Sequence, residues 1–404
     1  MGSDTIGLAE LTGRGAGPQS RAFSHRRAEA WDRFAQWSPV AARLCLAALL
    51  LLLAASAVVP LERPGGDPPA VTTTRDGRPI LGADEYDQDI ALYEAAIRRI
   101  EAGQHYYDFI ATEHRLRHYP VRPGFSVRLP TLAYLEAGLN KLALGVPLSI
   151  VIMVASVVVW WRRFGEEPGV GGLRRIATAM AFVGASLAVN RHYYALHELW
   201  AGMLLMLSFG LHRAPTLQRP ARWRWAFIFA ALALFIREHS LPFVLLMGAT
   251  AAWRREWREA AAWSALVLCF LAVLSVHLAI VSSLVLPGDP LGPSWLALRG
   301  LSGWLGNVVE SSNLRLLPHW IAGPLAVLTF LGWAGWRSPA GTFAFFIAVG
   351  YGVIFMIAGR WDNFYWGAMI APMLSAGLVF APRALCSLID AADFSWKPVK
   401  AIAR

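Results

Sequence analysis

Residues 225–253 read WAFIFAALALFIREHSLPFVLLMGATAAW, and this stretch decides how the chain can fold. Two apolar runs, 225–236 and 240–253, flank the polar sequence Arg237-Glu238-His239. At about 1.5 Å of rise per residue, neither run is long enough to cross the roughly 30 Å of bilayer hydrocarbon. A single helix over both runs would bury the polar residues in mid-membrane. We therefore expect two short helices meeting at Arg237, because charged groups held at such depth line a cavity or a site.

The whole chain has the composition of an integral membrane protein. Of its 404 residues, 56% are hydrophobic and 16% are charged, whereas soluble proteins carry about 25% charged residues. Mean hydropathy is +0.43. This excludes soluble enzymes, nucleic-acid binders and disulfide-stapled secreted domains. With the pair above, the apolar runs predict an all-α polytopic protein of about ten membrane spans: 41–60, 144–161, 175–190, 194–211, 262–286, 318–336, 341–358 and 364–382.

Basic residues in the short loops predict the orientation, because Lys and Arg accumulate on the cytoplasmic side. Most loop arginines fall on the side that also carries both termini. Most of the net charge of +10 is therefore expected on the cytoplasmic side of the membrane. We expect a disordered cytoplasmic tail over 1–38, a transmembrane domain over 39–383 and a cytoplasmic C-terminal tail over 384–404. Within the domain, 61–143 is the first extracytoplasmic loop and 287–317 is a second, smaller one.

The first extracytoplasmic loop contains two predicted amphipathic helices. Ile90, Tyr93, Ile97 and Ile100 recur at helical spacing, with charged residues elsewhere around the helix. This pattern is typical of a helix that lies on the membrane surface. The stretch from Pro130 to Leu144 opens with proline in a first helical turn and is too short to span. Packing alone can account for both helices, but Asp89 begins the first one and is well placed to meet a lipid headgroup.

On this topology, acids, bases and cations gather on the extracytoplasmic face. Polar loops are common, and that plain explanation is open for any single residue. The three cysteines, Cys45, Cys269 and Cys386, are too far apart to form a disulfide framework or a metal-ligand motif. The candidate residues on the extracytoplasmic face are Asp84, Asp87, Asp89, Arg191, Glu198, Arg237, Glu238, His239, His319, Arg360, Asp362 and Tyr365.

Four segments resemble the GT-C superfamily of polyprenyl-phosphate-sugar-dependent glycosyltransferases, which includes protein O-mannosyltransferases and bacterial lipid A aminoarabinose transferases. They are Asp89 to Gly103, with an Asp four residues before Tyr93; Leu129-Pro130-Thr131-Leu132-Ala133-Tyr134; Trp225 to Trp253, turning at Arg237; and Arg360 to Pro372. The chain departs from the family pattern at Thr131, where a second proline is usual, and at Arg237, where lysine is usual. The acid expected at the start of the fourth span appears as Glu198.

The resemblance implies an inverting hexosyl- or pentosyltransferase. Asp89 would take the proton of an acceptor hydroxyl on a glycan, lipid or protein as that oxygen attacks a sugar linked to polyprenyl phosphate. Preorganised cations would stabilise the leaving phosphate, with Arg237 and Arg360 first and Arg191, His239 and His319 behind them. Glu198 would orient the acceptor or join Asp89 around a divalent cation, Mg²⁺ or Mn²⁺. Asp84, Asp87, Glu238, Asp362 and Tyr365 are secondary candidates.

Two other function classes stay open at this point. A transporter or flippase of lipid-linked saccharides would also be polytopic, but it should show corresponding halves and midplane charges, and no internal repeat is visible. A membrane O-acyltransferase that modifies an envelope glycan could use His192, His197, His239 or His319 as its base. The dominance of arginine over lysine suggests a GC-rich bacterial genome, and hence an inner membrane protein with a periplasmic active site. Membrane lipids are expected partners, and nucleic acids are not.

Overall fold

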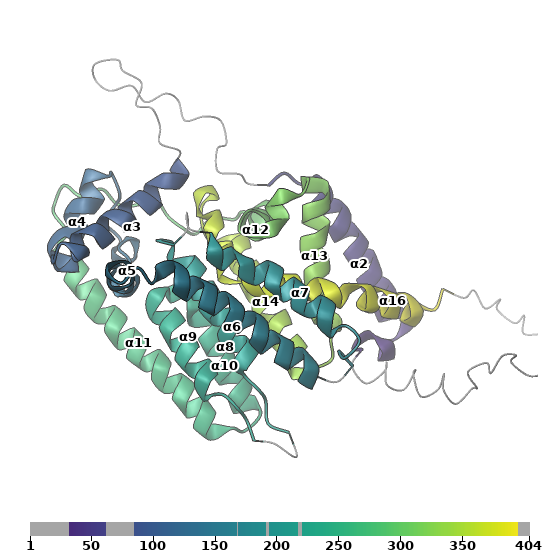
Figure 1. The fold of residues 1–404 in the computed structure, drawn as a ribbon. Helices are drawn as coiled ribbons and strands as arrows, with labels where there is room; N and C mark the ends of the chain where they lie inside the picture. The colour runs from purple at the N-terminus through teal and green to yellow at the C-terminus, as the bar shows by residue number, and fades with distance from the viewer. Residues whose placement is uncertain (1–31, 62–84, 168, 191–193, 217–219, 395–404) are drawn as a thin grey trace, which may run out of the picture.

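The structure is a computed structural model that describes residues 32–61, 85–167, 169–190, 194–216 and 220–394 (Figure 1). Throughout these residues the regular elements are helices, joined by loops with a few isolated β-bridges. The predicted all-α class is confirmed for this part of the chain. The α-helices are α2 (Pro39–Val58), α3 (Glu85–Glu101), α4 (Tyr106–Leu116), α5 (Thr131–Lys141), α6 (Gly145–Glu166), α7 (Arg174–Ala185), α8 (His197–Leu211), α9 (Arg224–Ile236), α10 (Leu241–Trp253), α11 (Trp257–Ser283), α12 (Gly300–Glu310), α13 (His319–Gly335), α14 (Pro339–Ile357), α15 (Ala371–Leu374) and α16 (Ala381–Ala392).

Short 3-10 helices connect several of these elements. They are η1 (Phe34–Gln36), η2 (Gly124–Ser126), η3 (Ser186–Val189), η5 (Glu238–Ser240), η6 (Asn313–Leu316), η7 (Trp361–Met369) and η8 (Ser375–Val379). The last of the predicted spans, 364–382, is therefore a broken segment made of η7, α15 and η8.

Four described helices are long and apolar enough to cross a membrane: α2, α6, α11 and α14. A fifth span results if residues 371–379 and 381–392, bent by 50° at their junction, count as one. Helices α8 and α9 are apolar but shorter. The chain thus has the character of a membrane protein with several spans, and the predicted number of about ten stays a prediction.

The pair of short helices expected around Arg237 is present. Helix α9 ends at Ile236, the extended backbone of Arg237 breaks it, and α10 begins after the single turn of η5. Pro242 lies in the first turn of α10, where its missing N–H costs no hydrogen bond. Helix α9 packs along α8, and α10 packs along α11 and α14. The turn at Arg237 therefore lies among neighbouring helices.

The first loop forms a small core of its own. Ile90, Ile97 and Ile100 are buried together with Phe109 and Ile110 of α4 and with residues of α5. The helical spacing predicted for α3 is confirmed, but its apolar stripe packs against protein. The sequence predicts that this stripe lies on lipid, but α4 and α5 offer a second apolar surface, which covers it. Figure 1 shows these three helices grouped beside the upper end of α11.

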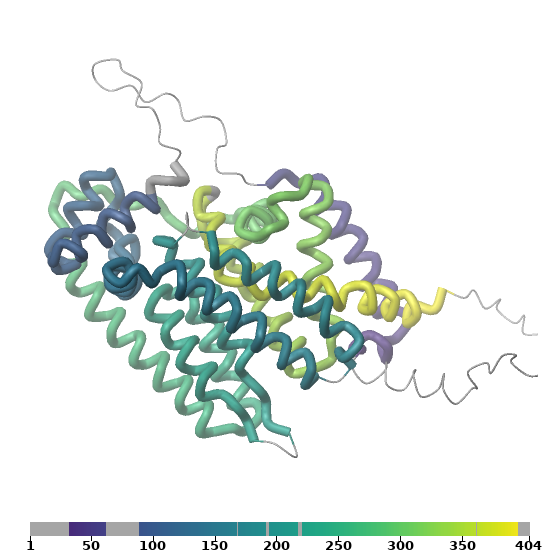
Figure 2. The backbone as a smooth tube through the Cα atoms, in the orientation of Figure 1, coloured from purple at the N-terminus to yellow at the C-terminus, as the bar shows by residue number. Residues whose placement is uncertain are grey.

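The described residues include part of each predicted tail, 32–38 and 384–394. Residues 1–31 and 395–404 lie outside the described residues. Phe34 is buried and Asp32 bonds Arg383, so residues 32–38 are packed rather than free. Helix α16 continues to Ala392 because Ala384, Leu388 and Ala392 form a buried stripe at helical spacing. It packs on α2 and α13, and Figure 2 shows the three together at one end of the molecule.

Helix α12 lies within the predicted second loop, 287–317, where no helix was expected. Residues Gly303 to Val309 are buried in it, although the run is too short to suggest a span. It packs against η7 so closely that a side chain at Gly367 would meet the carbonyl oxygen of Asn307. This contact requires glycine and holds the broken segment in place.

Candidate functional site

Asp89 and Tyr365 meet although 276 positions separate them in the chain. The Tyr365 phenol donates a hydrogen bond of 2.7 Å to Oδ2 of Asp89. Asp89 comes from α3 in the first loop, and Tyr365 comes from η7, which packs against α12 and α8. The Tyr119 phenol faces the same carboxylate, and its pKa is raised by burial and by the negative charge of Asp89. The predicted base is therefore held by a residue of η7.

A buried group of charges lies where α8 meets the turn between α9 and α10. Arg237 and Glu198 are 0% and 1% exposed, and Arg237 Nε lies 2.7 Å from Glu198 Oε1. The N–H does not point along this contact, so it is an ion pair without a directed hydrogen bond. Arg237 Nη1 also bonds Glu238. One guanidinium thus neutralises two carboxylates that would be costly to bury alone.

Arg128 joins this group to the first loop. Its Nη1 lies 3.4 Å from Glu238 Oε1, and its Nε donates to the Tyr93 hydroxyl over 3.3 Å. Its side chain is 13% exposed. The Asp89–Tyr365 pair is next to these contacts, because Asp89 lies one helical turn before Tyr93 on α3. We define the polar cluster as these seven residues: Asp89, Tyr93, Arg128, Glu198, Arg237, Glu238 and Tyr365.

Arg128 was not among the residues predicted from the sequence. A signal was present, because it lies directly before the Leu129-Pro130 segment that carries part of the family resemblance. It was missed because the motif is defined by the residues after it. Arginine in a loop is also common in this chain, so residue type alone did not single it out.

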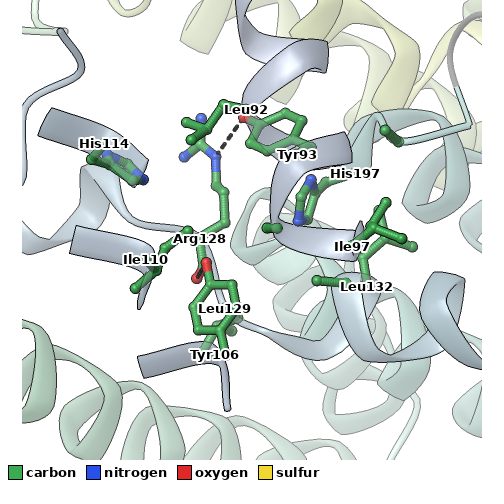
Figure 3. A pocket seen from close by; sticks show the side chains of 13 residues that line it. Leu92, Tyr93, Ile97, Tyr106, Ile110, His114, Arg128, Leu129, Leu132 and His197 are labelled. Atoms are coloured by element: carbon green, nitrogen blue, oxygen red, sulfur yellow. Dashed lines mark hydrogen bonds between the residues drawn. The ribbon is translucent and has the colours of Figure 1, made fainter. Parts of the chain in front are cut away.

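Arg128 projects into a small pocket (Figure 3). Tyr93, His114 and His197 also line it, and the remaining walls are mainly aliphatic and aromatic. Burial lowers the pKa of His114 to about 4, so this imidazole is neutral near pH 7. His197 is 4% exposed, and its Nδ1 has no hydrogen-bond partner among the described residues. The pocket therefore combines a permanent cation with two imidazoles.

Arg360 directly precedes η7 and pairs with a carboxylate of that same helix. It forms a two-pronged ion pair with Asp362 through Nε and Nη2, at 3.2 and 2.9 Å. Burial raises the pKa of Asp362, the guanidinium of Arg360 opposes this, and the charge of Asp89 raises the pKa further. Asp362 and Asp89 are therefore close enough for their charges to interact.

A larger cavity, of about 230 Å³, adjoins the Glu238 side of the polar cluster. The ring of His239 packs against Trp366 with centroids 4.4 Å apart, and the Tyr351 phenol donates to the His239 carbonyl. Apart from Glu238 and His239, the walls are almost entirely apolar. The lining residues are Glu238, His239, Leu241, Pro242, Tyr351, Ile354, Phe355, Trp366 and Met369.

For three of the other predicted residues the structure does not describe the side chain. Asp84 and Arg191 lie outside the described residues, and Asp87 lies in α3 at a position whose side chain is not described. His319 begins α13, where neither ring nitrogen has a hydrogen-bond partner among the described residues. No contact of the described residues connects His319 to the cluster.

The proposed carboxylate pair does not fit a divalent cation. Asp89 is engaged by Tyr365, whereas Glu198 is paired with Arg237. Over the described part of the chain, no three His, Cys, Asp or Glu side chains lie close enough to hold a metal ion. A cation such as Mg²⁺ needs several oxygen ligands around it.

Over the described residues, the chain is helical, with several helices long and apolar enough to cross a membrane and a largely buried polar cluster assembled from distant parts of the sequence. Comparison with known protein families, with curated proteins and with solved structures gives no significant match to this chain.

Proposed function

We propose that the chain is an inverting glycosyltransferase that moves a sugar from a polyprenyl-phosphate-linked donor to an acceptor hydroxyl on the periplasmic face of a bacterial inner membrane. The observation that supports it best is the polar cluster itself. It joins residues of all four segments that resemble the GT-C superfamily, or of their direct neighbours: Asp89 and Tyr93, Arg128, Arg237 and Glu238, and Tyr365.

The proposed reaction is a single displacement. Asp89 accepts the proton of the acceptor hydroxyl as its oxygen forms a bond to the anomeric carbon. The bond from that carbon to the phosphate oxygen breaks, and its electron pair leaves with the lipid phosphate. Attack from the side opposite the leaving group inverts the anomeric centre. The departing phosphate gains negative charge, which a positioned guanidinium stabilises.

Arg128 is the best-placed guanidinium for this role. Arg237 is completely buried between two glutamates, and Arg360 is paired with Asp362. Arg128 keeps part of its side chain exposed, and its contacts with Tyr93 and Glu238 are long. A phosphate can replace such loose contacts at less cost than it can separate a buried pair. In this proposal Arg237 holds Glu238 and Glu198 in place.

The apolar cavity beside Glu238 suits the lipid part of such a donor. Its walls come from α10, α14 and η7, and its polar edge touches the arginine–glutamate pairs. An isoprenoid chain needs apolar surroundings next to a cation for its phosphate. This arrangement supports a lipid-linked donor over a nucleotide sugar.

The direct test is Asp89→Asn in proteoliposomes, with transfer measured from a panel of polyprenyl-phosphate-linked hexoses and pentoses. General bases typically contribute about 10²- to 10⁴-fold to rate, and we expect a loss in this range. The matched control is Asp108→Asn, which changes an exposed carboxylate in the first turn of α4. It should transfer at the wild-type rate. Undiminished transfer by Asp89→Asn would contradict the assignment of the base.

A further inference from the structure

Asn363 and Tyr365 form a short hydrogen-bond chain that ends on Asp89. The backbone N–H of Arg360 lies 3.1 Å from Asn363 Oδ1, and Asn363 Nδ2 lies 3.3 Å from the Tyr365 hydroxyl oxygen. The Tyr365 hydroxyl lies 2.7 Å from Asp89 Oδ2. Asn363 is 3% exposed and Tyr365 is 8% exposed. The chain is therefore shielded from water along most of its length.

The direction of every hydrogen bond in this chain follows from its first member. A backbone N–H can only donate, so the Asn363 atom that faces Arg360 must be the amide oxygen. The NH₂ group of Asn363 then faces Tyr365 and donates to the phenol oxygen. The single hydrogen of the phenol is left to point at Asp89, whose ionised carboxylate can only accept.

Helix α12 and the residue after it bind the backbone of η7, which carries Asn363 and Tyr365. Asn307 Nδ2 donates to the Asn363 carbonyl over 3.2 Å, and Ser311 Oγ donates to the Phe364 carbonyl over 2.7 Å. Two residues outside η7 therefore hold the backbone of η7 next to Tyr365. Little freedom remains for Tyr365 to turn away from Asp89.

We propose that Asn363 and Tyr365 are positioning residues that orient the carboxylate of Asp89 for proton transfer; this inference rests on the proposed glycosyltransferase function. The phenol stays protonated throughout and is not itself the base. It occupies one of about four lone-pair positions on the carboxylate, and others remain for the acceptor hydroxyl. The proton moves from that hydroxyl to Asp89, while Tyr365 and Asn363 change neither bonds nor charge.

Two variants test the chain with minimal change of volume. Tyr365→Phe removes the donor to Asp89. Asn363→Asp keeps an acceptor for the Arg360 N–H but removes the donor to Tyr365, so the phenol hydrogen turns toward the new carboxylate and away from Asp89. We expect each variant to lower kcat by about tenfold, because a misplaced catalytic group loses rate rather than affinity. The KM for the polyprenyl-phosphate-linked donor should not change.

The double variant shows whether Asn363 acts on Asp89 through Tyr365 or whether the two residues affect kcat independently. If the residues act in series, Tyr365→Phe combined with Asn363→Asp loses no more kcat than Tyr365→Phe alone. Tyr107→Phe is the matched control, since it removes a phenol that bonds His277 Nδ1 over 2.9 Å and no member of the polar cluster. Its kcat should equal that of the wild type. Multiplied losses in the double variant, or an unchanged kcat in Tyr365→Phe, would overturn the proposal.

A second measurement does not depend on transfer activity. The melting temperatures of Asp89→Ala, Tyr365→Phe and the double variant are compared in detergent. A real bond between the two residues predicts that the double variant melts no lower than the less stable single variant. Additive losses would overturn the positioning chain even if the wild type transfers sugar. Non-additive melting without wild-type transfer from any donor would instead contradict the proposed function.

Discussion

Arg237 and Arg128 carry the same charge in different surroundings, and burial separates their roles. Arg237 is fully buried and contacts Glu198 and Glu238, so its removal leaves two carboxylates unpaired. Breaking a buried pair in this way costs about 3–5 kcal/mol. Arg128 is partly exposed, with contacts of 3.3 and 3.4 Å. Its removal leaves Glu238 still paired with Arg237.

This difference predicts opposite phenotypes for two alanine variants. Arg128→Ala should raise the KM for a polyprenyl-phosphate-linked donor by about tenfold or more, the worth of one charge-assisted hydrogen bond. Its melting temperature should stay near that of the wild type. Arg237→Ala should instead reduce the yield of folded protein and its melting temperature. Kinetics in proteoliposomes and thermal melts in detergent check both. A stable Arg237→Ala with only a raised donor KM would reverse the assignment.

At the scale of elements, glycines decide how closely the helices carrying the site approach each other. Gly202 lies one turn after Glu198 in α8 and faces η7, where an added Cβ would lie 2.0 Å from the Ala368 carbonyl oxygen. No real contact is that short, so α8 and η7 would have to move apart. The movement would separate Glu198 on one element from Tyr365 on the other.

Gly202→Ala is therefore expected to lower both the melting temperature and the rate of sugar transfer. The matched control is Gly350→Ala in α14, where an added Cβ meets nothing within 4 Å. Alanine is favoured over glycine inside helices by about 1 kcal/mol, so this control should be neutral or slightly stabilising. Equal effects of the two substitutions would show that the close approach of α8 and η7 does not matter.

Local sequence patterns predicted some of the helices and missed others. The apolar runs around Arg237 predicted α9, α10 and the turn between them, because run length and a charged interruption are local properties. Helix α12 was missed because its short apolar run looks like a loop in the sequence. The stripe of α3 was recognised, but the surface that covers it was not, since α4 and α5 become its partners only through tertiary packing.

At the scale of the whole molecule, the distribution of arginines predicts which ends of the helices face the cytoplasm. The test uses a variant in which Cys45, Cys269 and Cys386 are replaced by alanine and one cysteine is introduced. A membrane-impermeant maleimide on bacterial spheroplasts should label Ser294→Cys, in the second predicted extracytoplasmic loop. It should label Arg258→Cys only after the membrane is permeabilised. Both positions are exposed, so access depends on the side of the membrane. The reverse labelling would invert the topology and move the site to the cytoplasmic face.

The helical class, the membrane character and the turn at Arg237 could be predicted from the sequence, since hydrophobic length, charge and helix breaks act over a few residues. The sequence also singled out Asp89, Glu198, Arg237 and Tyr365 as candidates. Which of them touch could not be predicted, because folding alone brings Tyr365 to Asp89 and places Arg128 between Tyr93 and Glu238. These contacts join residues far apart in the chain, so their geometry depends on how all the helices pack.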